Sequence, residues 1–232
     1  MFEYKIDSFN EFLTEAKHIL PTEKKCLLFT DIKGSSLLWK SSETKMFKAI
    51  IDHEDQVFRL CDKYNGTVLK SIGDSFMISF DDLVEGIRFI IELQTELRDK
   101  PIKVGKDSIQ IRAGMCYGEV YERTSERQGK KLVDYFGNVV NTASRLESKV
   151  SEVGGFAFAY HSKQTKNDKD EIVELLEKEV DKFKVIDYTD ESSVDESRIR
   201  SGRLLSDTHK FVIRSLKKLK GVDKVIVYKC EI

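Results

Sequence analysis

Apolar residues recur along the first part of the chain with the spacing of helices and strands. Residues 7–20 carry an apolar stripe at helical spacing, and Pro21 ends the pattern. Residues 26–31 (CLLFTD) form a short apolar run that ends in a carboxylate, which is typical of a buried strand. Residues 41–64 return to helical spacing until Asn65-Gly66 interrupts it. This region therefore predicts a helix, a strand and a second helix.

The next segment has the pattern of a hairpin followed by a helix. Two short runs, 67–72 and 75–80, flank Gly73-Asp74, a pair that tolerates positive φ and so predicts a tight turn with Asp74 at its tip. Asp81-Asp82 can cap a helix with an apolar face, and alternation from Ile109 onward predicts a further strand. The order strand, helix, strand, strand, helix, strand is that of a ferredoxin-like (palm-type) βαββαβ fold of the α+β class.

The rest of the chain is more polar. Residues 122–132 are expected to form a loop or hairpin tip, and a third helix is expected at about 137–150. The charged segment at about 162–202 keeps some helical spacing and predicts a surface helix followed by a loop, and residues 225–228 predict a closing strand. We expect two parts: an N-terminal amphipathic helix at 1–22, more simply packed on its own domain than bound to a partner, and one domain at 23–232.

Composition narrows the class of protein. The 232 residues include 39 Lys+Arg and 40 Asp+Glu, and a net charge of −1 argues against a nucleic-acid partner. The four cysteines are far apart, with no CxxC pair, so neither a disulfide framework nor a thiolate zinc site is expected. No stretch reaches the ~18 apolar residues of a membrane helix, and the N-terminus does not resemble a signal peptide. The expected location is the cytoplasm, without a membrane partner.

Two carboxylates have the placement of metal ligands. Asp31 ends a strand and Asp74 sits at a hairpin tip, and either alone would more simply be a cap or turn residue. If their strands are neighbours, the two side chains lie together and suit a pair of Mg²⁺ or Mn²⁺ ions that also bind phosphates.

Two further groups could act on a phosphorylated ligand. Gly34, Ser35 and Ser36 follow Asp31 in a turn from strand to helix, where free N–H groups could bind a triphosphate. Asn141 and Arg145 are four residues apart on the third helix and share one of its faces, although Arg145 alone could simply be a solvated charge.

Together these segments resemble the catalytic domain of the class III nucleotidyl cyclases, the adenylate and guanylate cyclase family. The matching segments are 29–36 (FTDIKGSS), 69–74 (LKSIGD), 134–145 (DYFGNVVNTASR) and, more weakly, 219–221 (LKG). The resemblance covers about residues 25–160 and the C-terminal strand. It implies that 23–232 form the cyclase domain, with a charged insertion at about 162–202.

The resemblance implies a homodimer whose active sites are shared between the two chains. On one chain Asp31, Asp74 and the backbone carbonyl of Ile32 would hold two divalent cations, and the second copy would contribute Lys70, Asp134, Asn141 and Arg145. The ribose 3′-hydroxyl of a nucleoside triphosphate would attack the α-phosphate, and pyrophosphate would leave. In this scheme Asn141 orients the ribose, Arg145 stabilises charge on the α-phosphoryl group and Lys220 meets the outer phosphates. Lys33 departs from the family pattern, and its effect stays open.

The resemblance also bears on the base. In the family, lysine at the position of Lys70 with aspartate at that of Asp134 goes with adenine, whereas guanylate cyclases have glutamate and cysteine there. ATP is therefore modestly favoured as substrate, with cyclic AMP as product. Stand-alone bacterial members that make cyclic CMP or cyclic UMP in anti-phage defence have a similar layout, so a pyrimidine substrate is the alternative.

Two other classes of function compete. A catalytically silent cyclase-like module would have lost Asp31, Asp74, Asn141 or Arg145, and all four are present. A polymerase or diguanylate cyclase would share the fold and paired carboxylates, but the chain has no GGDEF-like run. We therefore expect an active nucleotidyl cyclase.

Overall fold

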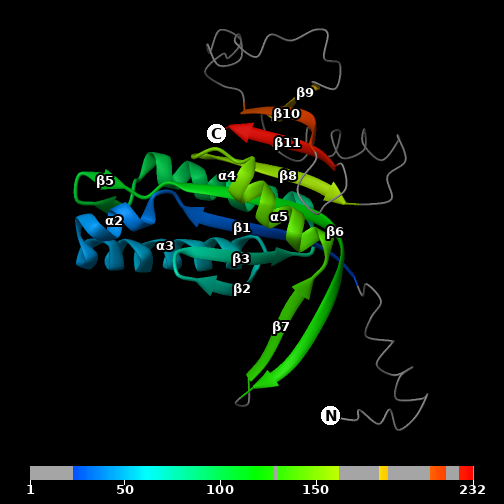
Figure 1. Cartoon of the computed structure of the whole chain (residues 1–232), viewed down its shortest axis with the longest axis horizontal. Helices are drawn as coiled ribbons and strands as arrows, with labels where there is room; N and C mark the ends of the chain where they lie inside the picture. The colour runs from blue at the N-terminus through cyan, green and yellow to red at the C-terminus, as the bar shows by residue number, and fades with distance from the viewer. Residues whose placement is uncertain (1–22, 128–129, 162–182, 188–209, 218–224, 232) are drawn as a thin grey trace, which may run out of the picture.

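The computed structural model (Figure 1) describes residues 23–127, 130–161, 183–187, 210–217 and 225–231. The expected N-terminal helix, most of the charged segment 162–202 and Lys220 lie outside these residues. The elements, in chain order, are β1 (Glu23–Ile32), α2 (Ser35–Ser41), α3 (Glu43–Lys63), β2 (Thr67–Ile72), β3 (Ser75–Phe80), α4 (Leu83–Asp99), β4 (Lys103–Val104), β5 (Asp107–Ser108), β6 (Ile111–Arg127), β7 (Lys130–Phe136), α5 (Asn138–Lys149), β8 (Gly155–His161), β9 (Phe183–Asp187), β10 (Lys210–Lys217) and β11 (Val225–Glu231).

One large sheet organises the domain. Its strand order is β2-β3-β1-β6-β8-β11-β10-β9, with β7 attached to β6. The first four strands of this order, with α3 and α4 between them in sequence, form the ferredoxin-like βαββαβ unit expected from the sequence. The pairs β6–β8 and β9–β10 are parallel, and the other pairs in this sheet are antiparallel.

The central strand β1 is buried on both faces, which explains its continuous apolar sequence. Cys26, Leu28 and Ile32 pack in the core beneath α3 and α4. Leu27 and Phe29 alternate with them and pack in the second core, beneath α5. By the same alternation Asp31 faces the α5 side of the sheet.

Several expected elements are confirmed at their boundaries. The hairpin β2–β3 turns at Gly73, whose φ is +65°, and Asp82 caps α4 by accepting a hydrogen bond from the N–H of Val84. The third helix is α5, and β11 continues three residues beyond the expected closing strand.

The helix expected at 41–64 is found as α3, and a separate short helix, α2, precedes it. They are separated at Ser42, whose backbone is extended (φ −169°, ψ 102°). The Ser41 hydroxyl donates to the Leu38 carbonyl at 2.7 Å, a local bond of the kind that favours helix ends over helix interiors.

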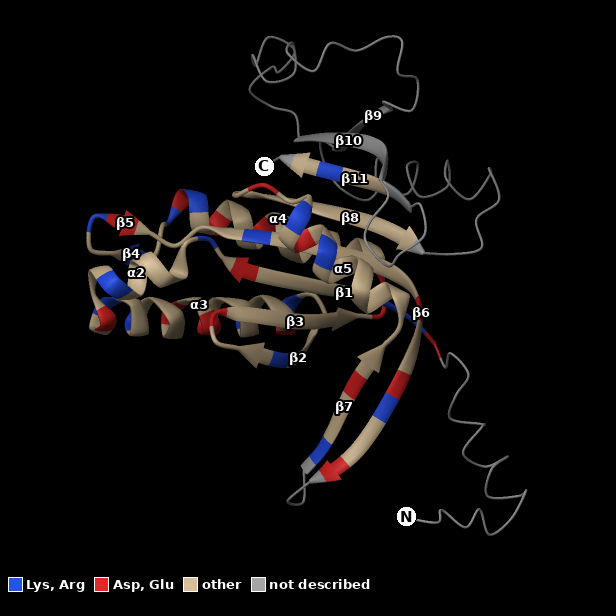
Figure 2. Ribbon diagram, in the orientation of Figure 1, with Lys and Arg blue, Asp and Glu red and all other residues tan. Residues whose placement is uncertain are grey.

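The polar stretch 122–132, expected to be a loop or hairpin tip, lies in the outer part of a hairpin, and its described residues are paired strand rather than loop. It lies in the long strands β6 and β7, which form an arm that extends away from the main sheet (Figure 1). Oppositely charged residues face one another across this arm, including Arg123 with Asp134 and Glu126 with Lys131. Figure 2 shows red and blue bands along both strands. The stretch is polar because much of the arm faces solvent, and not because it lacks regular structure.

Other strands had not been expected at all. The short hairpin β4–β5, the inner strand β8 and the strand β10 were missed, and β9 lies inside the charged segment. These strands depend on partners distant in sequence, which a local pattern does not identify.

Two further features of the fold concern its cysteines and its helices. The four cysteines are buried and no disulfide joins them. Burial raises the pKa of the Cys61 thiol to about 12. Within the described ranges, no helix is long and apolar enough to span a membrane.

Candidate functional site

Asp31 sits between two polar neighbours on adjacent strands. The Ser75 hydroxyl at the start of β3 donates to its Oδ1 at 2.8 Å, and Arg112 Nη2 on β6 donates to its Oδ2 at 2.8 Å. Arg112 is also the cross-strand partner of Asp31 in the β1–β6 register. The carboxylate is thus held from both sides while its side chain remains 29 % exposed.

The sheet register places the β2–β3 turn, which carries Asp74, beside the end of β1, because Thr30 pairs with Phe76. Figure 2 shows the acidic end of β1. The Oδ2 atom of Asp74 is shielded from solvent and has no hydrogen-bond partner among the described residues. A shielded carboxylate oxygen without a donor is costly unless a cation or a donor from a ligand completes it.

These donors fit a divalent cation. Asp31 and Asp74 supply hard carboxylate oxygens, and Oδ2 of Asp74 has no hydrogen-bond partner in the described part of the chain. In the part of the chain that the structure describes, no three or more His, Cys, Asp or Glu side chains form a metal cluster. Mg²⁺ is commonly held by one or two carboxylates, with substrate phosphates and water filling the other positions. Two carboxylates and a backbone carbonyl suit that mode better than a closed structural metal site.

Arg112 also contacts an acid from α5. Its Nη2 atom lies 3.1 Å from Oε1 of Glu147, so this nitrogen lies between two carboxylates. Glu147 is buried, and burial raises the pKa of its carboxyl group, against the opposing effect of Arg112. The three side chains link β1, β6 and α5.

Lys70 and Asp134 form an ion pair within the chain. Lys70 Nζ lies 2.6 Å from Asp134 Oδ2, and Asp134 Oδ1 accepts from the N–H of Tyr135 at 2.9 Å. The β2–β3 register shifts between Val68 and Lys70, so that Lys70 pairs with Met77, a residue of the core beneath α5. The irregularity thereby turns Lys70 toward the sheet face that Asp31 also occupies.

Asn141 and Arg145 lie one turn apart on α5, as expected. Arg145 Nη1 donates to the Asn141 carbonyl at 3.1 Å, and Asn141 is exposed. The opposite side of the helix is anchored in the core by Val139, Ala143 and Leu146. Among the described residues, no hydrogen bond or ion pair joins Asn141 or Arg145 to Asp31, Asp74 or Lys70.

The turn after β1 has the expected shape. Gly34 adopts a left-handed conformation (φ +67°), and its carbonyl accepts from the N–H of Leu37 at 2.9 Å. The N–H groups of Ser35 and Ser36 therefore begin a helix, although α2 has only seven residues. The side chains of Lys33 and Ser36 are exposed beside this turn.

Three residues of the site were not found from the sequence: Ser75, Arg112 and Glu147. Ser75 directly follows the predicted turn, and its neighbour Asp74 was the only available signal. Arg112 and Glu147 each look like an ordinary polar residue in a strand or helix, and they acquire a role only once β1, β6 and α5 are packed together.

Comparison of the sequence with known families gives a match to the adenylate and guanylate cyclase catalytic domain over residues 18–184. An adenylate cyclase of Neurospora crassa is 29 % identical over 147 residues, covering 55 % of this chain and 6 % of that protein. Receptor-type adenylate cyclase B of Leishmania donovani is 39 % identical over 75 residues, covering 32 % of this chain and 6 % of that protein. The chain thus spans only a small part of the length of these relatives.

Solved structures share the fold. The guanylate cyclase domain of RhGC from Catenaria anguillulae, in complex with GTP, superposes with a TM-score of 0.63 at 17 % identity, covering 90 % of this chain and 96 % of that one. A Trypanosoma brucei adenylate cyclase in its monomeric state gives 0.58 at 19 % identity, covering 91 % of this chain and 90 % of that one. With the family match over most of the chain, these results show that the protein belongs to the class III adenylate and guanylate cyclase catalytic domain family.

Proposed function

We propose that this chain is a nucleotidyl cyclase that converts a nucleoside triphosphate to a 3′,5′-cyclic nucleotide and pyrophosphate, with ATP favoured. The observation that carries the proposal is the position of Asp31 beside the β2–β3 turn, where Asp74 has a shielded carboxylate oxygen with no hydrogen-bond partner among the described residues. Family membership supports the same chemistry.

Two divalent cations, Mg²⁺ or Mn²⁺, would be held by Asp31, Asp74 and the Ile32 carbonyl, where they would acidify the ribose 3′-hydroxyl and neutralise phosphate charge. The chain's own residues bind and orient the substrate. The N–H groups that begin α2, at Ser35 and Ser36, face the triphosphate, and the left-handed Gly34 permits the turn.

The chemical step is an in-line displacement. The 3′-oxygen forms a bond to the α-phosphorus as it loses its proton, and the bond from that phosphorus to the bridging oxygen breaks. Pyrophosphate leaves with the electron pair. Arg145 stabilises the growing charge on the α-phosphoryl oxygens, Asn141 holds the ribose, and Lys220 neutralises the outer phosphates.

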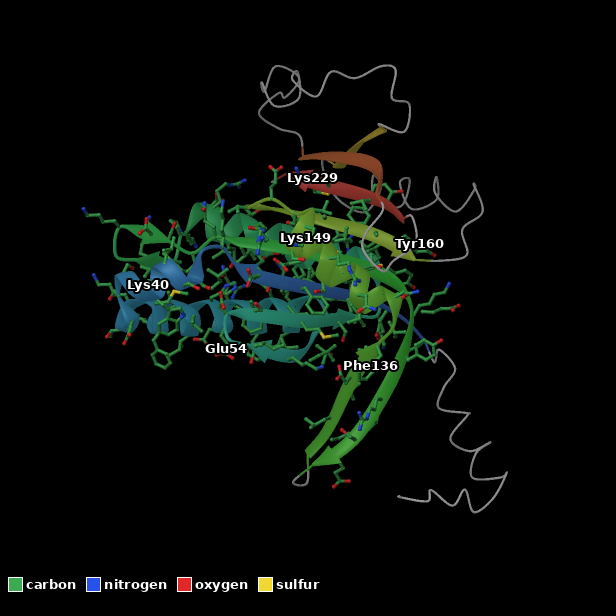
Figure 3. All side chains as sticks on the ribbon, viewed as in Figure 1. Lys40, Glu54, Phe136, Lys149, Tyr160 and Lys229 are labelled. Atoms are coloured by element: carbon green, nitrogen blue, oxygen red, sulfur yellow. The ribbon has the colours of Figure 1, made fainter. Side chains whose placement is uncertain are left out.

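We propose that the site is completed by a second copy of the chain. The outward face of α5 carries Asn141 and Arg145, and among the residues that the structure describes no hydrogen bond or ion pair joins them to Asp31 or Asp74. A homodimer with shared sites would bring this face of one copy to Asp31 and Asp74 of the other. Phe136 (Figure 3) and its cross-strand partner Tyr121 are 46 % and 40 % exposed, so they form an apolar surface near the base of the arm that a partner could cover.

The Lys70–Asp134 pair indicates which base of the nucleoside triphosphate the site would accept. Adenine and cytosine each present an exocyclic amine beside an unprotonated ring nitrogen, so an aspartate can accept from the amine while a lysine donates to the ring nitrogen. Guanine and uracil present a carbonyl oxygen beside a ring N–H, the reverse order. The pair therefore favours ATP or CTP, and several relatives named adenylate cyclase support ATP. A pyrimidine cyclase is the alternative, and anti-phage signalling would be its setting.

The proposal is tested by incubating the purified protein separately with ATP, GTP, CTP and UTP in Mn²⁺ and identifying products by mass spectrometry. Cyclic AMP as the main product supports the full proposal. Cyclic CMP or cyclic UMP as the main product would support the same reaction with CTP or UTP as the substrate. Absence of any cyclic product from a protein that still binds Mn²⁺ and nucleotide would support a silent regulatory module instead.

A further inference from the structure

The ion pairs around Asp31 join it to an acid that the proposed reaction does not use. Arg112 Nη2 lies 2.8 Å from Asp31 Oδ2 and 3.1 Å from Glu147 Oε1. Asp31 is partly exposed, whereas Glu147 is buried on the inner face of α5. One guanidinium is thus shared between a candidate metal ligand and a buried carboxylate.

The backbone packing fixes the place of Glu147. Gly114, two residues after Arg112 and on the same face of β6, lies directly beneath the backbone of α5. A Cβ atom at this position would lie 2.0 Å from the Glu147 nitrogen and 2.5 Å from the Ala143 carbonyl oxygen. The missing side chain lets α5 approach β6 closely enough for Glu147 to reach Arg112.

We propose that Glu147 positions the metal-binding carboxylate of Asp31 by holding the Arg112 guanidinium between the two acids. The inference rests on the proposed role of Asp31 as a metal ligand. Glu147 and Arg112 are positioning residues, because neither needs to touch the substrate.

The hydrogen-bonding capacity of a carboxylate explains how this arrangement helps. An ionised carboxylate has about four acceptor positions. In Asp31, Ser75 uses one position on Oδ1 and Arg112 uses one on Oδ2. Both oxygens keep a free position for a cation while the group is held in one orientation. Without Glu147, the fork of Arg112 can turn fully onto Asp31 and pair with both oxygens, which competes with the metal.

Electrostatics acts in the same direction. Two carboxylates around one guanidinium leave an excess negative charge, which attracts a cation. With Glu147 neutralised, Arg112 balances Asp31 and only Asp74 contributes excess negative charge, so this attraction is weaker. Partners that orient a metal ligand typically change metal affinity by about 10- to 100-fold when they are removed.

A double-mutant cycle tests the proposal with Mn²⁺ alone as the probe, its binding measured from the EPR signal of the free ion. Glu147→Gln should weaken Mn²⁺ binding by about tenfold in the native background, and by less than about twofold when Arg112→Gln is already present. The unfolding midpoint without metal reports whether each variant folds. Glu96→Gln is the matched control, because Glu96 pairs with Arg59 between α3 and α4 and should leave Mn²⁺ binding unchanged.

The outcomes separate this inference from the proposed function. If Asp31→Ala leaves Mn²⁺ binding intact, the metal assignment itself fails. If Asp31→Ala weakens Mn²⁺ binding but Glu147→Gln does not, only the positioning role fails. The same holds if Glu147→Gln weakens Mn²⁺ binding equally with Arg112 and with Arg112→Gln. Should Glu147→Gln not fold, Arg112→Lys replaces it: the lysine keeps the charge but lacks the planar fork, so weaker Mn²⁺ binding is expected. Native affinity in that variant would overturn the proposal.

Turnover gives a second readout. In Glu147→Gln the Mn²⁺ concentration for half-maximal rate should rise about tenfold, while kcat at saturating Mn²⁺ stays near that of the native protein. A merely structural defect would instead lower kcat at every metal concentration.

Discussion

Lys70 and Asp134 form an ion pair of 2.6 Å although they are 64 positions apart in sequence. Lys70 lies on the edge strand β2 and Asp134 on the arm strand β7. The pair places a donor and an acceptor side by side, which matches the adjacent ring nitrogen and amine of an adenine or cytosine base.

Replacing Lys70 should change the use of bases. We expect Lys70→Met to lower kcat/KM for ATP about 10- to 100-fold, because a hydrogen bond from a charged donor contributes about 1.5–3 kcal/mol. The dependence of the rate on Mn²⁺ should not change. Initial rates with all four triphosphates measure the effect, and Lys63→Met, which removes an exposed lysine paired with Glu92, is the control. An unaltered ranking of substrates would refute the assignment of Lys70.

Asp74→Asn should lower turnover without destabilising the fold. Turnover should fall by about a hundredfold or more, since a metal ligand supplies several kcal/mol of transition-state stabilisation. The unfolding midpoint without metal should stay the same or rise, because the variant removes a shielded charge without a hydrogen-bond partner at Oδ2. Cyclase assays over a Mn²⁺ titration and thermal unfolding test both parts. Near-normal turnover would remove Asp74 from the metal site.

Mixing two inactive variants tests the shared site. Asp31→Ala and Arg145→Ala chains should each be inactive, and their heterodimer should contain one intact composite site. After equal mixing with full exchange, about a quarter of native activity is expected, because half of the dimers are mixed and each has one of two sites intact. If mass spectrometry shows heterodimers but no activity returns, the site is not shared in this way.

His53 should make stability depend on pH. It is buried on α3 with its ring 5.7 Å from that of Phe76, and burial lowers the pKa of its imidazole to about 4. In the unfolded chain the imidazole binds a proton near pH 6.5, whereas in the folded chain it does so only near pH 4. The free energy of unfolding therefore decreases as the pH falls from 6.5 to 4. The full loss is about 3 kcal/mol.

Urea unfolding at pH 7, 5.5 and 4.5 measures this loss. In His53→Leu the part of the pH dependence that comes from the imidazole should disappear, so the stability difference between the variant and the native protein should change with pH. A constant difference across the range would show that His53 does not titrate as expected.

Gly114→Ala tests the close packing of α5 on β6. The added methyl group would overlap backbone atoms of Glu147, Ala143 and Leu146 and force the helix away. We expect a loss of about 1–3 kcal/mol in the free energy of unfolding, measured by urea denaturation. Ser148→Ala, at an exposed position of the same helix, should have little effect. A stability unchanged by Gly114→Ala would mean that α5 accommodates the methyl group without cost.

The sequence by itself determined the elements whose signals are local. Continuous apolar residues marked β1, and Gly73-Asp74 marked the turn between β2 and β3, because glycine accepts the positive φ that the turn needs. Helical spacing marked α3, α4 and α5. The family motifs marked the same segments as candidate sites, so Asp31, Asp74, Asn141 and Arg145 could be named without coordinates.

The tertiary structure decided what these residues contact, because strand register and helix packing depend on partners far away in the chain. The polar residues of the arm form strands because β6 and β7 pair with each other in solvent. The shift in register before Lys70 determines the sheet face on which Lys70 contacts Asp134. The link from Asp31 through Arg112 to Glu147 exists only because Gly114 lets α5 lie against β6. Local patterns reveal no such contact, since each of its residues has an ordinary sequence environment and the close approach is a property of the packed fold.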